Sequence, residues 1–137
     1  MSFWRRALEF TFHEIGHVEN TCNELAEPSV IRALQSRIII HPALTEGLSG
    51  FQPGDRLLVL FVFHLIEDGY ELMQHPRKDP ARAPQGVFTL CSPRRPNPIG
   101  ATVVDLLEIK GNVLLVAGLD AVNGTPILDI KPAFKSL

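Results

Sequence analysis

Residues 102–116 read TVVDLLEIKGNVLLV, and this stretch decides the fold class of the chain. Two runs rich in β-branched and other apolar residues, 102–107 and 113–116, flank the turn signal Lys110-Gly111-Asn112. β-Branched residues fit the pleated surface of a sheet, and a short turn containing Gly and Asn between two such runs is typical of a hairpin. The stretch therefore predicts an antiparallel β-hairpin.

Three further runs predict strands of the same sheet. Each is rich in apolar and β-branched residues and borders a turn signal: residues 37–41 before Pro42, residues 56–66 after Pro53-Gly54-Asp55, and residues 125–130 after Asn123-Gly124. The second run is almost continuously apolar, which is typical of a central strand with both faces covered. Residues 29–36 predict a short helix or an irregular segment.

Two other regions carry weaker signals. Residues 9–18 begin by alternating aromatic and polar side chains around Phe10 and Phe12, which favours a strand. Residues 75–98 hold six of the eleven prolines of the chain, so regular structure there must be short, because proline fixes φ and lacks an amide donor. Within that region only residues 86–90 predict a strand.

The whole pattern predicts an all-β fold, in which an antiparallel sheet closes into a small barrel with little helix. A chain of 137 residues with 45% hydrophobic and 20% charged residues has the size and composition of one globular domain. We expect a single domain over residues 1–137.

Composition argues against several classes of protein. The longest apolar run, residues 57–63, is far shorter than the roughly 20 residues of a membrane-spanning helix, and no signal peptide is recognisable. Cys22 and Cys91 form no CxxC pair, which argues against a disulfide framework and a cysteine-rich zinc site. With a net charge of -2, a nucleic-acid partner would have to meet a local basic patch. We expect a cytoplasmic protein without membrane or metal.

The segment His13-Glu14-Ile15-Gly16-His17 matches the zinc motif H-E-x-x-H. On a helix the two histidines stand about 6 Å apart along the axis, whereas on a strand the same offset separates them by about 13 Å. The aromatic alternation before the motif and Gly16 inside it favour a strand. The sequence therefore predicts two strand histidines and no metallopeptidase site.

Positive charge is concentrated in residues 75–100, where the local net charge is +4. The charged residues are Arg77, Lys78, Arg82, Arg94 and Arg95 against the single acid Asp79. Guanidinium forks suit phosphate, although a charge cluster alone is typical of a solvated loop. In Arg95-Pro96-Asn97-Pro98 two prolines stiffen the backbone around one polar side chain, which favours a binding loop.

Asp129 and Lys131 lie two residues apart in a predicted strand and therefore share one of its faces. Two interpretations stay open. The residues form a surface ion pair, worth well under about 1 kcal/mol, or they hold a zwitterionic or nucleotide ligand.

Several blocks of the chain follow one another in a specific order. They are Gly86-Val87-Phe88, Ser92-Pro93-Arg94-Arg95-Pro96-Asn97-Pro98-Ile99-Gly100, Gly118-Leu119-Asp120-Ala121, Gly124-Thr125-Pro126 and Asp129-Ile130-Lys131-Pro132. Together they resemble the signature of the TrmO/TsaA-like (YaeB-like) family of S-adenosylmethionine-dependent tRNA methyltransferases. With Ile15-Gly16 and Phe61-Val62-Phe63-His64, the resemblance covers nearly the whole chain.

The resemblance implies a β-barrel that binds S-adenosylmethionine, works as a homodimer and methylates the exocyclic nitrogen of threonylcarbamoyl-adenosine next to the tRNA anticodon. It implies cofactor contacts from His64, Leu65, Cys91, Ala101, Leu119, Asp120, Ala121 and Val122. It implies substrate or pocket contacts from Arg94, Arg95, Asn97 and Lys131. The acceptor nitrogen carries a carbonyl group, and its lone pair is delocalised into that group, so the nitrogen is a weak nucleophile. Removal of its proton by a general base should help, and Asp129 is the candidate.

The chain departs from the family pattern at four places. Leu90-Cys91 stands in place of Thr-Arg, Leu65 in place of Gln, and Ala133 in place of Tyr, while residues 21–36 lack a Pro-Arg-Gln segment. Two other functions therefore stay open: a methyltransferase for a different small acceptor, and a non-catalytic S-adenosylmethionine-binding dimer. The additional C-terminal domain of longer members is expected to be absent.

Overall fold

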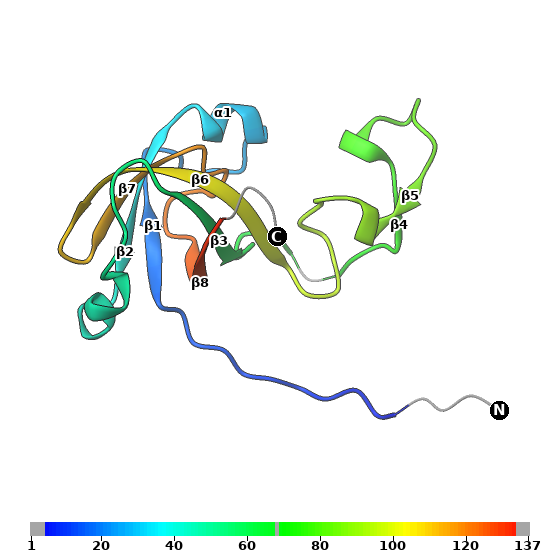
Figure 1. Cartoon of the computed structure of the whole chain (residues 1–137). Coiled ribbons are helices and arrows are strands. Elements are labelled where there is room, and N and C mark those ends of the chain that lie inside the picture. The colour runs from blue at the N-terminus through cyan, green and yellow to red at the C-terminus, as the bar shows by residue number, and fades with distance from the viewer. Residues whose placement is uncertain (1–4, 68, 134–137) are drawn as a thin grey trace.

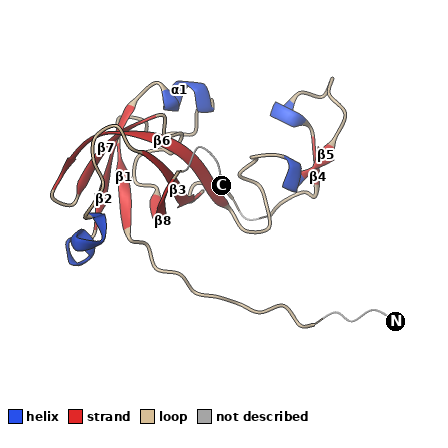
Figure 2. Ribbon diagram, viewed as in Figure 1, coloured by secondary structure: helices blue, strands red, loops and turns tan. Residues whose placement is uncertain are grey.

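The computed structural model describes residues 5–67 and 69–133, and six of its strands form a closed antiparallel barrel (Figures 1 and 2). The barrel strands are β1 (Gly16–Glu19), β2 (Gln35–Ile40), β3 (Arg56–Val62), β6 (Ile99–Lys110), β7 (Val113–Ala117) and β8 (Pro126–Pro132). Their order is β1-β2-β7-β6-β3-β8, and pairing of β8 with β1 closes the ring. The predicted all-β barrel is confirmed.

The remaining elements are short. They are α1 (Pro28–Arg32), the 3-10 helices η1 (Pro42–Leu48), η2 (Pro76–Lys78) and η3 (Val87–Thr89), and the two-stranded sheet of β4 (Met73–Gln74) and β5 (Gln85–Gly86). Figure 1 shows α1 at one end of the barrel and β4, β5, η2 and η3 on an excursion to its side. We call this excursion, residues 69–98, the proline arm. No helix in the described ranges has the length and apolar character needed to cross a membrane.

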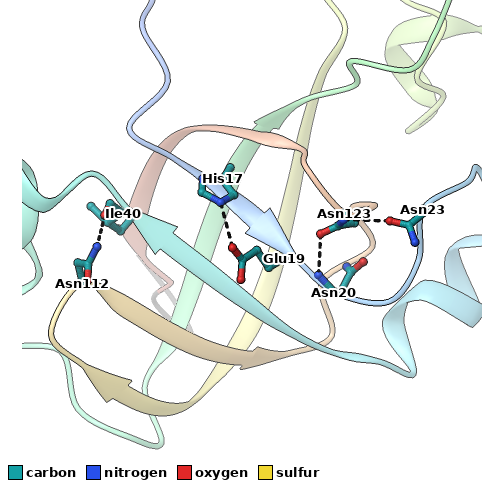
Figure 3. Close-up of polar contacts among 7 residues, drawn as sticks. All are labelled: His17, Glu19, Asn20, Asn23, Ile40, Asn112 and Asn123. Atoms are coloured by element: carbon teal, nitrogen blue, oxygen red, sulfur yellow. Dashed lines mark hydrogen bonds and ion pairs between the residues drawn. The ribbon is translucent and has the colours of Figure 1, made fainter.

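The hairpin predicted from residues 102–116 is confirmed and explains how β6 and β7 meet. Lys110 pairs with Val113, so Gly111 and Asn112 form a two-residue turn, and Gly111 has a φ of +60° that suits glycine. The Asn112 side chain donates a hydrogen bond to the Ile40 carbonyl over 2.6 Å (Figure 3), and the Ile40 amide donates to the Asn112 carbonyl over 2.9 Å. The turn is thereby fastened to the end of β2.

Alternate residues of the strands point inward and fill the barrel. The most deeply buried are Val18, Ile38, Leu57, Val59, Leu106, Leu114, Val116 and Ile127. Phe61 lies among them, and its ring rests on Gly100 of β6, where a Cβ would come within 2.4 Å of the ring. Each such aliphatic or aromatic side chain contributes about 1.5–3 kcal/mol by leaving water. This core holds β3 and β6 in the register on which the candidate site depends.

Strand β3 is central, as predicted, because it pairs with both β6 and β8. It ends at Val62 rather than Ile66, and the chain turns away over His64 and Leu65. In β8 the register shifts so that Leu60 faces Asp129 and Phe61 faces Ile127. The bulge leaves the carboxylate of Asp129 on the outer surface of the barrel.

Two predicted strands are wrong or too long. The strand predicted over residues 9–18 begins only at Gly16, because residues 9–14 make no main-chain hydrogen bonds to a neighbouring strand among the described residues. The strand predicted over residues 86–90 is the 3-10 helix η3, preceded by the two residues of β5. There Thr89 Oγ1 donates to the Gly86 carbonyl and the Leu90 amide to the Val87 carbonyl, so local turns replace a ladder.

The H-E-x-x-H segment does not form the helix that chelation needs. Residues 13–15 are extended chain and His17 lies in β1, where its Nε2 atom is 3.4 Å from Glu19 Oε1 (Figure 3). Glu14 instead approaches His41, with 3.9 Å between Oε1 and Nε2. No cluster of three or more potential metal-ligating side chains occurs within residues 5–67 and 69–133.

Candidate functional site

A hollow of about 130 Å³ lies between α1, the end of β3 and the loop before β8. Its walls are mostly apolar and come from four segments: Leu25, Ala26, Pro28 and Ile31; residues 61–66; Cys91 and Pro93; and Asp120, Ala121, Val122 and Thr125. Only a few polar side chains, chiefly His64, Asp120 and Thr125, interrupt this lining. Apolar walls with a few fixed polar groups are typical of small-molecule sites.

The hollow brings together six of the eight residues predicted to contact a cofactor. They are His64, Leu65, Cys91, Asp120, Ala121 and Val122. The other two lie elsewhere: the Leu119 side chain is fully buried in the core, and Ala101 is exposed on the outside of β6, opposite Leu60. Leu119 can therefore meet a ligand only through its main chain.

Asp120 is held rigidly at the wall of the hollow. Thr102 Oγ1 donates to one carboxylate oxygen over 2.5 Å, and Arg32 Nη2 donates to the other over 3.0 Å. The Asp120 side chain is only 17% exposed, so a charged donor and a hydroxyl satisfy a mostly buried carboxylate. The sequence did not indicate Arg32 or Thr102, because they come from α1 and β6 and meet Asp120 only in the folded chain.

Asn20 fixes the loop that forms one wall. Its side-chain amide donates to Ser36 Oγ over 3.0 Å and to the Ala121 carbonyl over 2.9 Å, while its Oδ1 accepts from the Cys22 amide. The Asn20 main-chain amide donates to Asn123 Oδ1 over 3.1 Å (Figure 3). This network joins the end of β1 to Ala121 and Asn123, which come about 100 residues later in the chain, and it sets the position of Ala121 at the hollow.

We predict that Asn20→Ala lowers the free energy of unfolding by about 2 kcal/mol. The substitution removes three side-chain hydrogen bonds and leaves the hydroxyl of Ser36, which is fully buried, without its donor. Urea unfolding followed by circular dichroism measures the loss. Asn23→Ala is the matched control, because Asn23 is exposed and, among the described residues, its side chain hydrogen-bonds only with Asn123. Equal stability of the two variants would show that the network around Asn20 is not a structural clamp.

The proline arm reaches the hollow through Cys91 and Pro93, and Arg95 shapes it there. Arg95 Nη1 donates to the Leu90 carbonyl over 2.8 Å and to the Ser92 carbonyl over 3.1 Å. The guanidinium of Arg95 thus holds the main chain of residues 90–95 in a compact loop. Arg94 and Asn97, in contrast, are exposed, and their main chains make the hydrogen bonds inside the arm. The Arg94 amide donates to Ser92 Oγ over 3.3 Å, the Arg94 carbonyl accepts from Gln74 Nε2, and the Asn97 carbonyl accepts from the Ile99 amide.

Near its tip the proline arm presents two cations on an unusual backbone. Arg77 and Lys78 have φ values of 54° and 57°, a left-handed conformation that costs a non-glycine residue on the order of 1 kcal/mol or more. The His75 ring donates from Nδ1 to the Arg82 carbonyl over 2.7 Å, and the Lys78 amide donates to the His75 carbonyl. These bonds hold the turn that displays both charges to solvent.

Asp129 and Lys131 lie outside the hollow. Their side chains form an ion pair of 3.0 Å on the outer face of β8, and both are about half exposed. Asp129 Oδ1 also accepts a hydrogen bond from the amide of Ile130. The surface ion pair is therefore present, while a ligand-binding or catalytic role stays a prediction. Most of the predicted site residues fall into three groups, the hollow, the proline arm and this outer face, while Leu119 in the core and Ala101 on the outside of β6 lie apart from them.

Comparison with known proteins places residues 20–137 in a match to the tRNA-methyltransferase O N-terminal domain. A protein of Escherichia coli named tRNA (adenine(37)-N6)-methyltransferase is 34% identical over 134 residues, which are 90% of this chain and 57% of that protein. A Probable S-adenosyl-L-methionine-binding protein of Methanothermobacter thermautotrophicus is 39% identical over 103 residues, 75% of this chain and 72% of that one.

A second archaeal relative and a solved structure agree with these matches. A Probable S-adenosyl-L-methionine-binding protein of Pyrococcus abyssi is 34% identical over 109 residues, 77% of this chain and 56% of that protein. The crystal structure of TrmO from Pseudomonas aeruginosa superposes with a TM-score of 0.73 at 25% identity, covering 95% of this chain and 60% of that one. The chain thus spans little more than half the length of several relatives that it matches.

Proposed function

Because the chain belongs to the family of the tRNA-methyltransferase O N-terminal domain, we propose that it is an S-adenosylmethionine-dependent methyltransferase acting on an adenine of tRNA. The exocyclic nitrogen of threonylcarbamoyl-adenosine next to the anticodon is the proposed acceptor. The observation that carries the proposal is the hollow, in which six of the cofactor residues implied by the family resemblance meet. The names of the Escherichia and Methanothermobacter relatives support the same reaction and the same cofactor.

The lining of the hollow suits one end of the cofactor. Its volume of about 130 Å³ is below the roughly 300–1,000 Å³ of pockets that enclose a whole ligand. The apolar walls fit a flat adenine ring, and the fixed carboxylate of Asp120 can accept a hydrogen bond from a hydroxyl or amino group. We therefore assign the adenosyl part to the hollow, with the remainder directed toward the proline arm.

When bound, the cofactor supplies a methyl group on a sulfonium sulfur. The chain has to hold the acceptor nitrogen in line with that group, and such positioning supplies much of the rate of a bimolecular reaction. Transfer of the methyl group to the acceptor nitrogen would leave that nitrogen with a proton to give up. A residue of the protein that takes this proton would accelerate the step.

Asp129 remains our candidate for the base, and we predict that Asp129→Asn lowers kcat by about 100-fold or more, the usual effect of removing a general base. Cofactor binding should be unchanged, because Asp129 lies outside the hollow. Single-turnover transfer of a labelled methyl group measures the effect. Asp105→Asn is the control, since Asp105 is an exposed acid paired with Arg56 on the outer surface. An Asp129→Asn variant with the turnover of the control would show that another group accepts the proton.

The exposed cations of the proline arm support a nucleic-acid substrate. Arg77, Lys78 and Arg94 are exposed on one excursion of the chain, so the arm can reach phosphates that the acidic chain as a whole would repel. We propose that these residues and Asn97 meet the tRNA backbone, whereas Arg95 acts through the shape of the loop. Lys131 does not belong to this set, because it forms an ion pair with Asp129 on the outer face of β8.

Two measurements test the proposed function. Calorimetric titration with S-adenosylmethionine should show binding, and methyl transfer should occur on tRNA that carries the threonylcarbamoyl group but not on tRNA without it. Absence of cofactor binding would overturn the proposal. Binding without transfer to either tRNA would favour a different small acceptor or a non-catalytic binding protein.

We further propose that the protein works as a homodimer in the cytoplasm. The predicted site residues are divided between the hollow and the outer face of β8, and a second copy can bring its outer face against the hollow. Apolar residues lie on the outer surface of β6, which is separated from β8 by β3: Ile99 and Val103 are each about two-fifths exposed. Sedimentation equilibrium of the full chain tests the two-copy assembly.

A further inference from the structure

The segment that precedes β1, residues 5–15, leaves the barrel as an extended chain, which we call the N-terminal arm (Figure 1). Its large apolar side chains are in solvent: Leu8 is 59% exposed, and Phe10 and Phe12 are each 72% exposed. Phenylalanine side chains contribute strongly to stability when buried, and several along one segment mark an interaction surface. The exposed apolar side chains of the arm therefore indicate a surface that binds a partner.

The main chain of the arm is also without hydrogen-bond partners within the described chain, except at Ile15 where the arm joins the barrel. Its first main-chain hydrogen bonds are made by Ile15, whose amide donates to the Ile127 carbonyl and whose carbonyl accepts from the His41 amide, both over 2.8 Å. Residues 5–14 make none among the described residues. Because the barrel is closed, it offers the arm no free sheet edge to join. An extended segment with two open edges is suited to pair with another strand.

The side chains of the arm are complementary to the same arm of a second copy. In an extended chain, alternate residues share one face, and here that face reads Arg6, Leu8, Phe10, Phe12, Glu14. Antiparallel pairing centred on Phe10 places Arg6 opposite Glu14 at both ends and Leu8 opposite Phe12 between them. Aromatic–aliphatic pairs and opposite charges facing each other are the favourable cross-strand pairs of a sheet.

Neighbouring registers lose this match. Centring the pair on Thr11 puts Leu8 opposite Glu14, and centring it on Glu9 puts two carboxylates opposite each other. Centring it on Phe12 sets Phe10 against Glu14. Of the registers centred on Glu9, Phe10, Thr11 and Phe12, the one centred on Phe10 is self-complementary along this face. It fits a second copy of the arm, because a twofold axis through Phe10 makes both contacts identical.

We propose that the N-terminal arms of two copies pair as an antiparallel ribbon centred on Phe10. The inference rests on the proposed two-copy assembly and assigns the segment that joins the copies. The ribbon buries the aromatic face that each copy alone leaves in water, and it gives the main chain of residues 6–14 the partners that it lacks. Its ends are held by the two barrels, which adds support to an otherwise short two-stranded unit.

Cysteine cross-linking tests the register. In a Cys22→Ser, Cys91→Ser background, Phe10→Cys should form an intermolecular disulfide at least tenfold faster than Phe12→Cys. Cysteines at position 10 face each other, whereas those at position 12 stand about 13 Å apart along the ribbon, beyond disulfide reach. The two native side chains are equally exposed, so accessibility is matched. Equal rates would overturn the register. If both variants sediment as dimers and neither forms the cross-link, arm pairing is overturned.

A charge exchange provides the second test and separates this inference from the proposed function. Arg6→Glu and Glu14→Arg should each weaken dimerisation at least tenfold, because like charges then face each other, and the double variant should restore it. If neither single variant weakens the dimer, or if the double variant does not restore it, the pairing is wrong. Calorimetric binding of S-adenosylmethionine is measured on the same proteins. A chain that binds the cofactor but fails the exchange loses the arm inference alone, whereas a chain that does not bind it loses the proposed function.

Discussion

Replacement of Gly16 by alanine is expected to lower the free energy of unfolding by about 3 kcal/mol or more, the upper range of overpacking effects. A Cβ at this position would lie 2.2 Å from the carbonyl oxygen of Ile39 and 3.0 Å from the Ile40 Cα. These are main-chain atoms of β2, the strand with which Gly16 pairs, and they cannot move without breaking the ladder between β1 and β2. Chemical unfolding followed by circular dichroism measures the loss.

Gly47→Ala is the matched control for this substitution. Gly47 is exposed in η1, and no described atom outside its chain neighbours and its own helix backbone lies within 4 Å of the position its Cβ would take. The control should unfold at nearly the same urea concentration as the native chain. If the two alanine variants differ by less than about 0.5 kcal/mol, the usual range for harmless surface changes, the close approach of β1 to β2 is not a constraint on the fold.

Cys91→Trp is expected to weaken binding of S-adenosylmethionine by at least about 100-fold, which corresponds to about 2.7 kcal/mol. Cys91 lies on the proline arm at the rim of the hollow and is exposed, so the barrel can fold around a larger side chain there. An indole directed inward would occupy most of the roughly 130 Å³ in which we place the adenosyl group. Calorimetric titration gives the affinity.

Two variants control for the thiol and for the indole. Cys91→Ser keeps the size of the side chain and should bind the cofactor nearly as well as the native chain. Phe88→Trp adds an indole at a residue of the same arm that is 77% exposed and does not line the hollow. If Cys91→Trp, with an unchanged circular dichroism spectrum, binds as tightly as these controls, the cofactor lies elsewhere.

The strands of the barrel could be predicted where local signals and tertiary pairing agree. The hairpin of β6 and β7 follows from two apolar runs around Gly111-Asn112, and β3 follows from an apolar run after Gly54. Residues 9–14 have the same alternation, yet they form no strand, because a strand exists only when a neighbouring strand pairs with it. Alternation predicts which side chains share a face and says nothing of whether a partner is present.

The residues of the candidate site likewise divide into those that a local sequence signal predicts and those that only the folded chain reveals. The six residues of the hollow were assigned through short contiguous blocks that resemble a family, such as the one around Asp120. Asn20, Arg32 and Thr102 escaped prediction because each acts across a long stretch of sequence, Asn20 on Ala121 and the other two on Asp120. A single asparagine or threonine gives no local signal of such a contact.

Strand β1 has only four residues, and it connects the N-terminal arm at one end to Asn20, which fixes the wall of the hollow, at the other. Because β1 is this short, a restriction of its motion at one end also restricts the residues at its other end. Pairing of the arms would restrict β1 and with it the loop around Ala121, so assembly would favour ligand binding. Thermodynamic linkage then requires the reverse by the same factor: cofactor in the hollow would promote association of the two copies.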